Sequence, residues 1–204
     1  MVHGYHVVFG TYGFWLPNDQ RGSWSNFIAV WELRLQGPTT KGTERQQLTD
    51  EQQRWQQSTK LKLQYPEVHL DGQQALAIGC GFKNAIHKSK FTIWACSILP
   101  QHVHLVIARH RFKVEYIAGL LKGEATKKLN QQKCHPLAGY KTKENETPTP
   151  WTARCYRGFL ESEQEIEDAM SYVIENPIKE GKRRQKWSFV TPFVGLDPGW
   201  NTYQ

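Results

Sequence analysis

Apolar positions along this chain follow the periods of both strands and helices. Apolar residues alternate or run together, with turn residues around them, in segments that predict strands near 6–12, 91–98, 102–109 and 152–160. Apolar stripes at helical spacing predict helices after Asp71, over 112–131 and after Ser162. Strands and helices are therefore expected to alternate along the chain.

The expected helices have recognisable ends. Asp71 is a good N-cap, and Ser162-x-x-Glu165 has the spacing of a capping box. Pro177 is expected to end the last helix, because a proline disfavours helical geometry in the residue before it. A further, Gln-rich helix over 49–64 is only weakly amphipathic.

A length of 204 residues predicts a single domain, 1–204. Residues 24–46 show no clear period and are expected to be an insertion, and 187–204 form a tail with Gly and Pro. The segment 134–150 has the composition of a mobile loop, which we expect to act as a hinge for the last third of the chain.

The strand predicted near 102–109 carries two histidines. Its side-chain period of two places His102 and His104 on one face, and Val103 and Leu105 on the other. Paired imidazoles on a rigid element suit a metal ion. Two imidazoles complete no coordination sphere, so a chance pair in a sheet remains an open alternative.

Charge and composition narrow the choice of partner. The chain has 26 Lys and Arg against 19 Asp and Glu, a formal net charge of +7, which favours a polyanion such as nucleic acid. Aromatic residues left exposed could stack on single-stranded bases, although most are expected in the core. A basic surface without a ligand is the alternative.

The four cysteines form no Cys-x-x-Cys pair, which argues against a zinc knuckle or a redox motif. There is neither a signal-peptide pattern nor an apolar run long enough to cross a membrane. We therefore expect no membrane partner and a cytoplasmic location.

The last predicted helix carries a second candidate. Tyr172 and Asn176 are four residues apart, so they share a helix face if the helix holds through Asn176. A tyrosine near a divalent cation can act as a nucleophile on phosphorus. Alternatively, the tyrosine packs at the helix edge and the asparagine is a C-cap.

Together these two segments resemble a known family. The sequence ILPQHVHLVI at 98–107 is similar to the histidine-hydrophobic-histidine motif of the HUH single-stranded DNA endonucleases, in their single-tyrosine, IS200-like transposase branch. The sequence YVIENPIKEG at 172–181 resembles the Tyr-x-x-x-Asn-Pro helix of the REP-associated tyrosine transposases. The similarity spans roughly 6–181.

The resemblance implies a role for each matching residue. His102, His104 and Asn176 would bind Mg²⁺ or Mn²⁺, with waters and a DNA phosphate oxygen at the other positions, and Tyr172 would be the nucleophile. Its attack on single-stranded DNA would leave a 5′-phosphotyrosine link and a free 3′-OH. Tyr156 and, less readily, Tyr140 are backup nucleophiles.

The resemblance also implies the fold class and the partner. It predicts an α+β fold, a central antiparallel sheet with packed helices related to the ferredoxin-like and RRM folds, which the predicted elements fit. The implied partner is single-stranded or hairpin DNA with palindromic repeats, bound by a monomer or a homodimer. Candidate DNA contacts are Arg21, Lys122, Lys127, Arg154, Arg157, Lys182 and Arg183.

Two other functions fit the sequence. A non-catalytic single-stranded or hairpin nucleic-acid-binding protein would use the same basic surface without cutting DNA. A zinc hydrolase with His102, His104 and His6 as ligands would leave Tyr172 and Asn176 unexplained.

Overall fold

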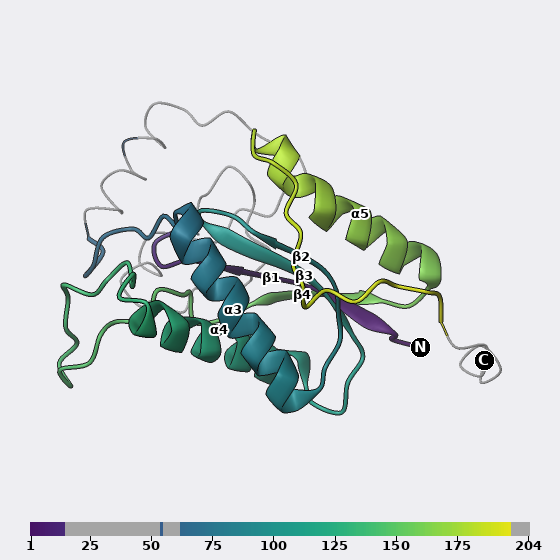
Figure 1. The fold of residues 1–204 in the computed structure, drawn as a ribbon, viewed down its shortest axis with the longest axis horizontal. Helices are drawn as coiled ribbons and strands as arrows, with labels where there is room; N and C mark the ends of the chain where they lie inside the picture. Colours follow the sequence, from purple (N-terminus) through teal and green to yellow (C-terminus); the bar gives the residue numbers. More distant parts are fainter. Residues whose placement is uncertain (15–53, 55–61, 197–204) are drawn as a thin grey trace.

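The computed structural model describes residues 1–14, 54 and 62–196 (Figure 1). Its elements are β1 (Gly4–Gly10), α3 (Gly72–Ser89), β2 (Ile93–Ile98), β3 (His102–Ala108), α4 (Val114–Gln131), β4 (Tyr156–Leu160) and α5 (Glu163–Lys179). The predicted insertion at 24–46, most of the predicted helix at 49–64, and Arg21 lie outside the described residues.

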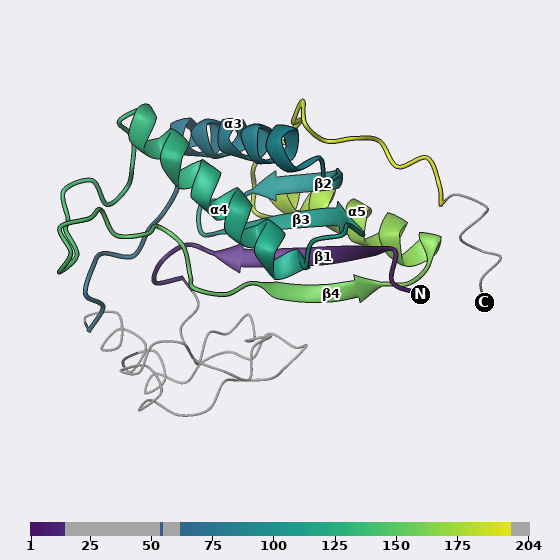
Figure 2. The ribbon, with the colours of Figure 1, turned by 90° about the horizontal axis from the view of Figure 1, so that it is seen from below.

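The four strands form one sheet in the order β2-β3-β1-β4, and every neighbouring pair is antiparallel (Figure 2). Strands β1 and β2 are joined in sequence through α3, and β3 lies between them in the sheet. A β-α-β unit with another strand inserted between its two strands is the split β-α-β arrangement of ferredoxin-like folds. The predicted α+β class with a central antiparallel sheet is confirmed.

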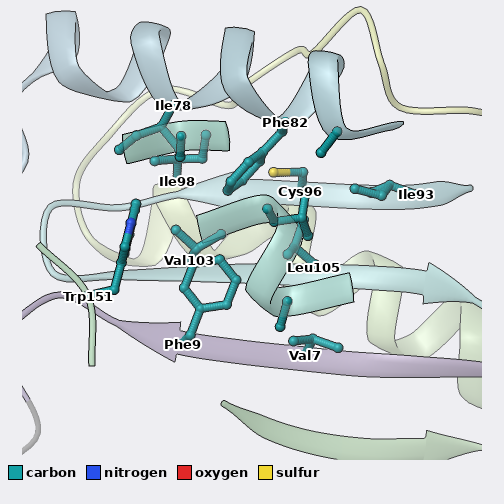
Figure 3. Packing of buried hydrophobic residues seen from close by; sticks show 14 of the residues in the cluster. Val7, Phe9, Ile78, Phe82, Ile93, Cys96, Ile98, Val103, Leu105 and Trp151 are labelled. Atoms are coloured by element: carbon teal, nitrogen blue, oxygen red, sulfur yellow. The ribbon is translucent and has the colours of Figure 1, made fainter. Parts of the chain in front are cut away.

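Helices cover both faces of this sheet. Helices α3 and α4 pack on one face, over a core that includes Val7, Phe9, Val103 and Leu105 (Figure 3). Helix α5 lies on the opposite face (Figures 1 and 2), over a smaller cluster of Ala95, Val106, Leu160, Ile166 and Val173. Because alternate residues of β3 face opposite sides, its histidines share a face with Val106 and with α5.

The last strand is shorter than predicted. Strand β4 begins at Tyr156, and Trp151 makes only an isolated bridge to Thr11. Between them, the ammonium of Lys122 donates to the carbonyl oxygens of Thr152 and Arg154, at 2.8 and 3.0 Å. The Thr152 N–H also donates to the Gly10 carbonyl, so this segment is tied to both α4 and the end of β1 before β4 begins.

Both predicted N-caps are present. Asp71 forms a complete capping box with Gln74. The Ser162 side chain accepts from the Glu165 N–H, whereas the Glu165 carboxylate accepts from the N–H of Glu161, at 2.6 Å. The second capping box is therefore only half formed.

The expectation that Pro177 ends α5 is wrong. The helix continues through Pro177 to Lys179, and its C-cap is Glu180, whose N–H donates to the Asn176 carbonyl. Pro177 lies two residues before the last helical residue and removes one backbone donor, so only the Val173 carbonyl loses its partner within the helix. Asn176 is consequently a helical residue and not the C-cap.

The segments after α4 and α5 both contribute to the core. Leu137 is buried, and the Cys134 carbonyl accepts from the Gln74 amide, so the segment predicted as a loop packs back on α3. In the predicted tail, Trp187 and Phe189 pack on the same core. No helix in the described part of the chain is long and apolar enough to cross a bilayer.

Candidate active site

Polar and aromatic side chains gather on the α5 face of the sheet. His102 and His104 come from β3 and His6 from the neighbouring strand β1. The strand register sets Val8 opposite both His104 and Tyr156, so Tyr156 of β4 lies on this face as well. Three adjacent strands thus place four ring side chains beneath α5.

Tyr172 reaches this group from α5. Its ring centre lies 5.6 Å from that of His104 and 5.7 Å from that of His6, both in edge-to-face geometry. Tyr172 remains 44% exposed, so this residue is accessible at the surface. The tyrosine and the histidine pair predicted from two distant motifs therefore lie together within one chain.

The backup tyrosines are placed differently from each other. Tyr156 lies 6.4 Å, ring centre to ring centre, from His6. Tyr140 instead packs against Tyr65, in the segment between α4 and β4. Tyr156 is thus beside the histidines, whereas Tyr140 contacts a different part of the molecule.

His6 and His104 contact each other through ring nitrogens. The Nε2 atom of His6 lies 3.1 Å from Nδ1 of His104, which is a hydrogen-bond distance. The ring planes are only 19° apart and the ring centres 5.4 Å apart, about the N···N distance plus the two ring radii. The rings therefore meet edge to edge, nitrogen to nitrogen.

Burial controls the charge of these rings. Desolvation lowers the pKa of His104 well below its usual value, and the neighbouring His102 and His6 lower it further. Desolvation also lowers the pKa of His6 to about 4. Both imidazoles are consequently neutral at pH 7, as ligands of a metal ion must be.

The end of α5 faces the first histidine. The Oε1 atom of Glu180 lies 3.7 Å from Nε2 of His102, whose ring also stacks on Phe14 with the ring centres 5.0 Å apart. Tyr172, Asn176 and Glu180 follow each other at intervals of four residues and so share a helix face. Asn176 therefore lies on the helix between Tyr172, which contacts His104, and Glu180, which lies near His102.

Asn176 has the surroundings of a ligand residue. It is only 7% exposed, and among the described residues its Nδ2 atom has no hydrogen-bond partner. An unsatisfied buried amide costs about 1–3 kcal/mol. The amide oxygen and nitrogen are interchangeable by a flip, which would put an oxygen at this buried position.

The donor set of two imidazoles and an amide oxygen suits a divalent cation with open positions for water and phosphate. Within the described ranges, no group of three or more His, Cys, Asp or Glu is arranged to hold a metal ion. His6, the third ligand of the zinc alternative, has its Nε2 directed at His104. The set of His102, His104 and Asn176 remains the predicted one.

The predicted DNA-contacting residues fall into two groups. Some have their charge engaged by the protein: Lys122 by two carbonyls, Lys127 by Glu124, and Arg157 by Glu115. Arg154, Lys182 and Arg183 are exposed, and the last two follow the end of α5 in the sequence. Their roles remain predictions.

Two further residues belong to this region and were not singled out in the sequence. Glu180 faces His102, and the Lys179 ammonium lies 4.9 Å from the centre of the Tyr172 ring. Both would be found by continuing the Tyr172–Asn176 helical spacing for one more turn. The expected helix end at Pro177 concealed that signal.

No family model and no curated protein matches this chain. Among solved structures, the chain is similar to a REP-associated tyrosine transposase bound to a REP hairpin, with 13% identity, a TM-score of 0.47, and coverage of 97% of this chain and 93% of that chain. It is also similar to a candidate transposase of Deinococcus radiodurans R1, with 12% identity, a TM-score of 0.38, and coverage of 86% and 91%.

Proposed function

We propose that this protein is a metal-dependent endonuclease and strand transferase that cuts single-stranded or hairpin DNA with a tyrosine nucleophile. The observation that carries the proposal is the position of Tyr172, whose ring lies against His104 and His6 on the α5 face of the sheet. A nucleophile beside buried neutral imidazoles is an arrangement suited to phosphoryl transfer.

His102, His104 and Asn176 would hold Mg²⁺ or Mn²⁺ in this site. The bound cation would polarise the scissile phosphate and stabilise the negative charge that develops on its oxygens. The Oε1 atom of Glu180, 3.7 Å from Nε2 of His102, is a further oxygen that a movement of this side chain could bring to the cation. Buried, neutral side chains on a strand and a helix would keep the ligand geometry fixed before DNA binds.

Tyr172 would supply the nucleophile. Its phenolic oxygen forms a bond to phosphorus, the P–O3′ bond breaks, and the proton lost by the phenol balances the one gained by the departing 3′-OH. The Lys179 ammonium lies 4.9 Å from the centre of the Tyr172 ring, in a cation–π contact that adds a positive charge beside the nucleophile. The resulting 5′-phosphotyrosine retains the bond energy, so a 3′-OH can reverse the step and join strands without ATP.

The substrate follows from the sequence resemblance and the charge. A hairpin with a flanking single strand is the expected DNA, and a net charge of +7 favours its phosphates. Lys182 and Arg183 are the predicted contacts nearest the site in sequence, since they follow α5 within four residues of its end.

A covalent-adduct assay tests this proposal. Wild-type protein incubated with a hairpin-bearing single-stranded oligonucleotide and Mg²⁺ should give a protein–DNA adduct that survives a denaturing gel. Tyr172→Phe should form none, and His102→Ala should lose cleavage while it still binds DNA. Tyr140→Phe, whose ring packs against Tyr65 away from the histidines, is the matched control and should retain the adduct.

An adduct that persists in Tyr172→Phe would contradict the assignment of the nucleophile. In that case Tyr156, near His6, is the residue to replace next. Salt-dependent DNA binding by the wild type with no adduct under any metal condition would instead support the non-catalytic nucleic-acid-binding alternative.

A further inference from the structure

One histidine of the site has no part in the function proposed above. His6 belongs to β1, yet its Nε2 atom lies 3.1 Å from Nδ1 of His104, in a partly buried contact between residues 98 positions apart. The near-coplanar rings direct the N–H of one straight at the lone pair of the other, which is favourable hydrogen-bond geometry.

The contact allows two arrangements of one proton. If Nε2–H of His6 donates, Nδ1 of His104 accepts, and the proton of His104 is then on its own Nε2, which is no longer a metal ligand. If Nδ1–H of His104 donates to His6, Nε2 of His104 keeps its lone pair. Only the second arrangement leaves His104 with a nitrogen that can bind a cation.

We propose that His6 is a positioning residue, whose Nε2 accepts the Nδ1–H of His104, fixes the tautomer of His104, and directs its Nε2 to the metal. The inference rests on the proposed function, since it takes His104 as a ligand. Histidines that bind metals usually donate their other ring N–H to an acceptor that fixes both tautomer and orientation. Here the acceptor is a second imidazole.

The surrounding structure holds the pair in place. His6 and His104 lie on adjacent strands, β1 and β3, whose register is set by seven residue pairs, from Gly4–Ala108 to Gly10–His102. From the other side, the Tyr172 ring packs edge to face against both imidazoles, with ring centres at 5.7 and 5.6 Å. The tautomer of His104 is thus fixed beside the candidate nucleophile.

Long-range ¹H–¹⁵N spectra of the imidazole rings test the inference directly, because ring nitrogen shifts distinguish Nδ1–H from Nε2–H. In metal-free wild-type protein at pH 7, His104 should carry its proton on Nδ1. In His6→Phe that preference should weaken or reverse. His6→Gln, whose side-chain carbonyl can accept the same proton, should restore it.

Mn²⁺ affinity, measured by calorimetry without DNA, is the second readout. His6→Phe should bind Mn²⁺ about 10–100-fold more weakly than the wild type, the usual effect of losing an outer hydrogen-bond partner of a ligand, and His6→Gln should recover much of the affinity. His87→Phe, an exposed histidine on α3, is the control and should leave both readouts unchanged.

An Nε2–H proton on His104 in the wild type would overturn the inference, and so would an unchanged Mn²⁺ affinity in His6→Phe. The wild-type spectrum decides the matter even if His6→Phe does not fold. Neither readout uses DNA cleavage, so failure of the proposed nuclease function is recognised separately, from the adduct assay with Tyr172→Phe.

Discussion

The Oε1 atom of Glu180 lies 3.7 Å from Nε2 of His102, across the gap between the end of α5 and the start of β3. This separation exceeds an N–H···O hydrogen bond, and a small movement of the carboxylate would bring both atoms within reach of one cation. The carboxylate is 37% exposed, so it can adjust toward an ion. The helix extension through Pro177 is what brings it there.

Replacement of Glu180 by Gln should therefore weaken metal binding. Loss of an anionic oxygen beside a divalent cation should lower Mn²⁺ affinity by about tenfold, with the fold intact because the residue is a half-exposed C-cap. Calorimetric titration with Mn²⁺ measures the effect. Glu175→Gln removes a carboxylate of the same helix that pairs with Arg184 at the surface, and it should change nothing. Equal affinities of both variants would remove Glu180 from the site.

The buried histidines predict a specific dependence of stability on pH. The pKa of His6 is about 4 when folded, and desolvation also lowers that of His104, whereas both are near 6.5 in an unfolded chain. Below pH 6.5 the unfolded chain binds protons that the folded chain does not. The free energy of unfolding should fall as the pH drops from 6.5 toward 4, by up to about 1.4 kcal/mol per pH unit for each histidine.

Urea unfolding of metal-free protein at several pH values between 4.5 and 7.5 would check this, and His6→Phe provides the comparison. The variant should lose less stability on acidification than the wild type, since one of the two protons is no longer taken up. Above pH 6.5 the two curves should run parallel. Identical slopes below pH 6.5 would show that His6 titrates normally in the folded protein.

Helices α3 and α4 approach each other closely at Gly81. A Cβ atom there would lie 2.6 Å from both the Ala125 Cα and the Glu124 carbonyl oxygen, which are backbone atoms with no freedom to rotate away. Gly81→Ala should force the helices apart and lower the free energy of unfolding by roughly 1–3 kcal/mol. Gly119→Ala, on α4 with nothing within 4 Å of the added atom, should instead stabilise by up to about 1 kcal/mol. Chemical denaturation distinguishes the two signs.

Basic residues near the site should differ in what they contribute to DNA binding. The double variant Lys182→Ala, Arg183→Ala should bind single-stranded DNA more weakly and flatten the slope of log K against log salt by about 1.4, since each phosphate contact contributes about 0.7. Fluorescence anisotropy at several salt concentrations measures the slope. An unchanged slope would exclude these two residues as phosphate contacts.

Lys122 should behave in the opposite way. Its ammonium is engaged by the Thr152 and Arg154 carbonyls and lies over the Phe9 ring, and burial lowers its pKa to about 8. Lys122→Met should leave the salt slope unchanged while it lowers the free energy of unfolding by about 1–2 kcal/mol, because two carbonyls lose their donor. A reduced salt slope in a stable Lys122→Met variant would return this lysine to the DNA interface.

Much of this fold could be predicted from local pattern. Period-two alternation identified β3 and set His102 and His104 on the face opposite Val103 and Leu105, and helical spacing identified α3, α4 and α5. These features depend on neighbours within a turn or a strand, so the sequence carries them locally. The same reasoning failed at Pro177, where a propensity rule was outweighed by the packing of a helix whose Ile166 and Val173 are fully buried.

By itself, the sequence determined the candidate site residues: a histidine pair on a strand and a tyrosine with an asparagine one helical turn later. Only the tertiary structure decided that His6 contacts His104, that Glu180 faces His102, and that the Lys122 ammonium bonds to backbone carbonyls of the segment before β4. Those contacts join residues 30 to 98 positions apart, and they arise from strand register and from helices docking on a sheet. Local periodicity contains no information about which distant nitrogen or oxygen such docking brings within reach.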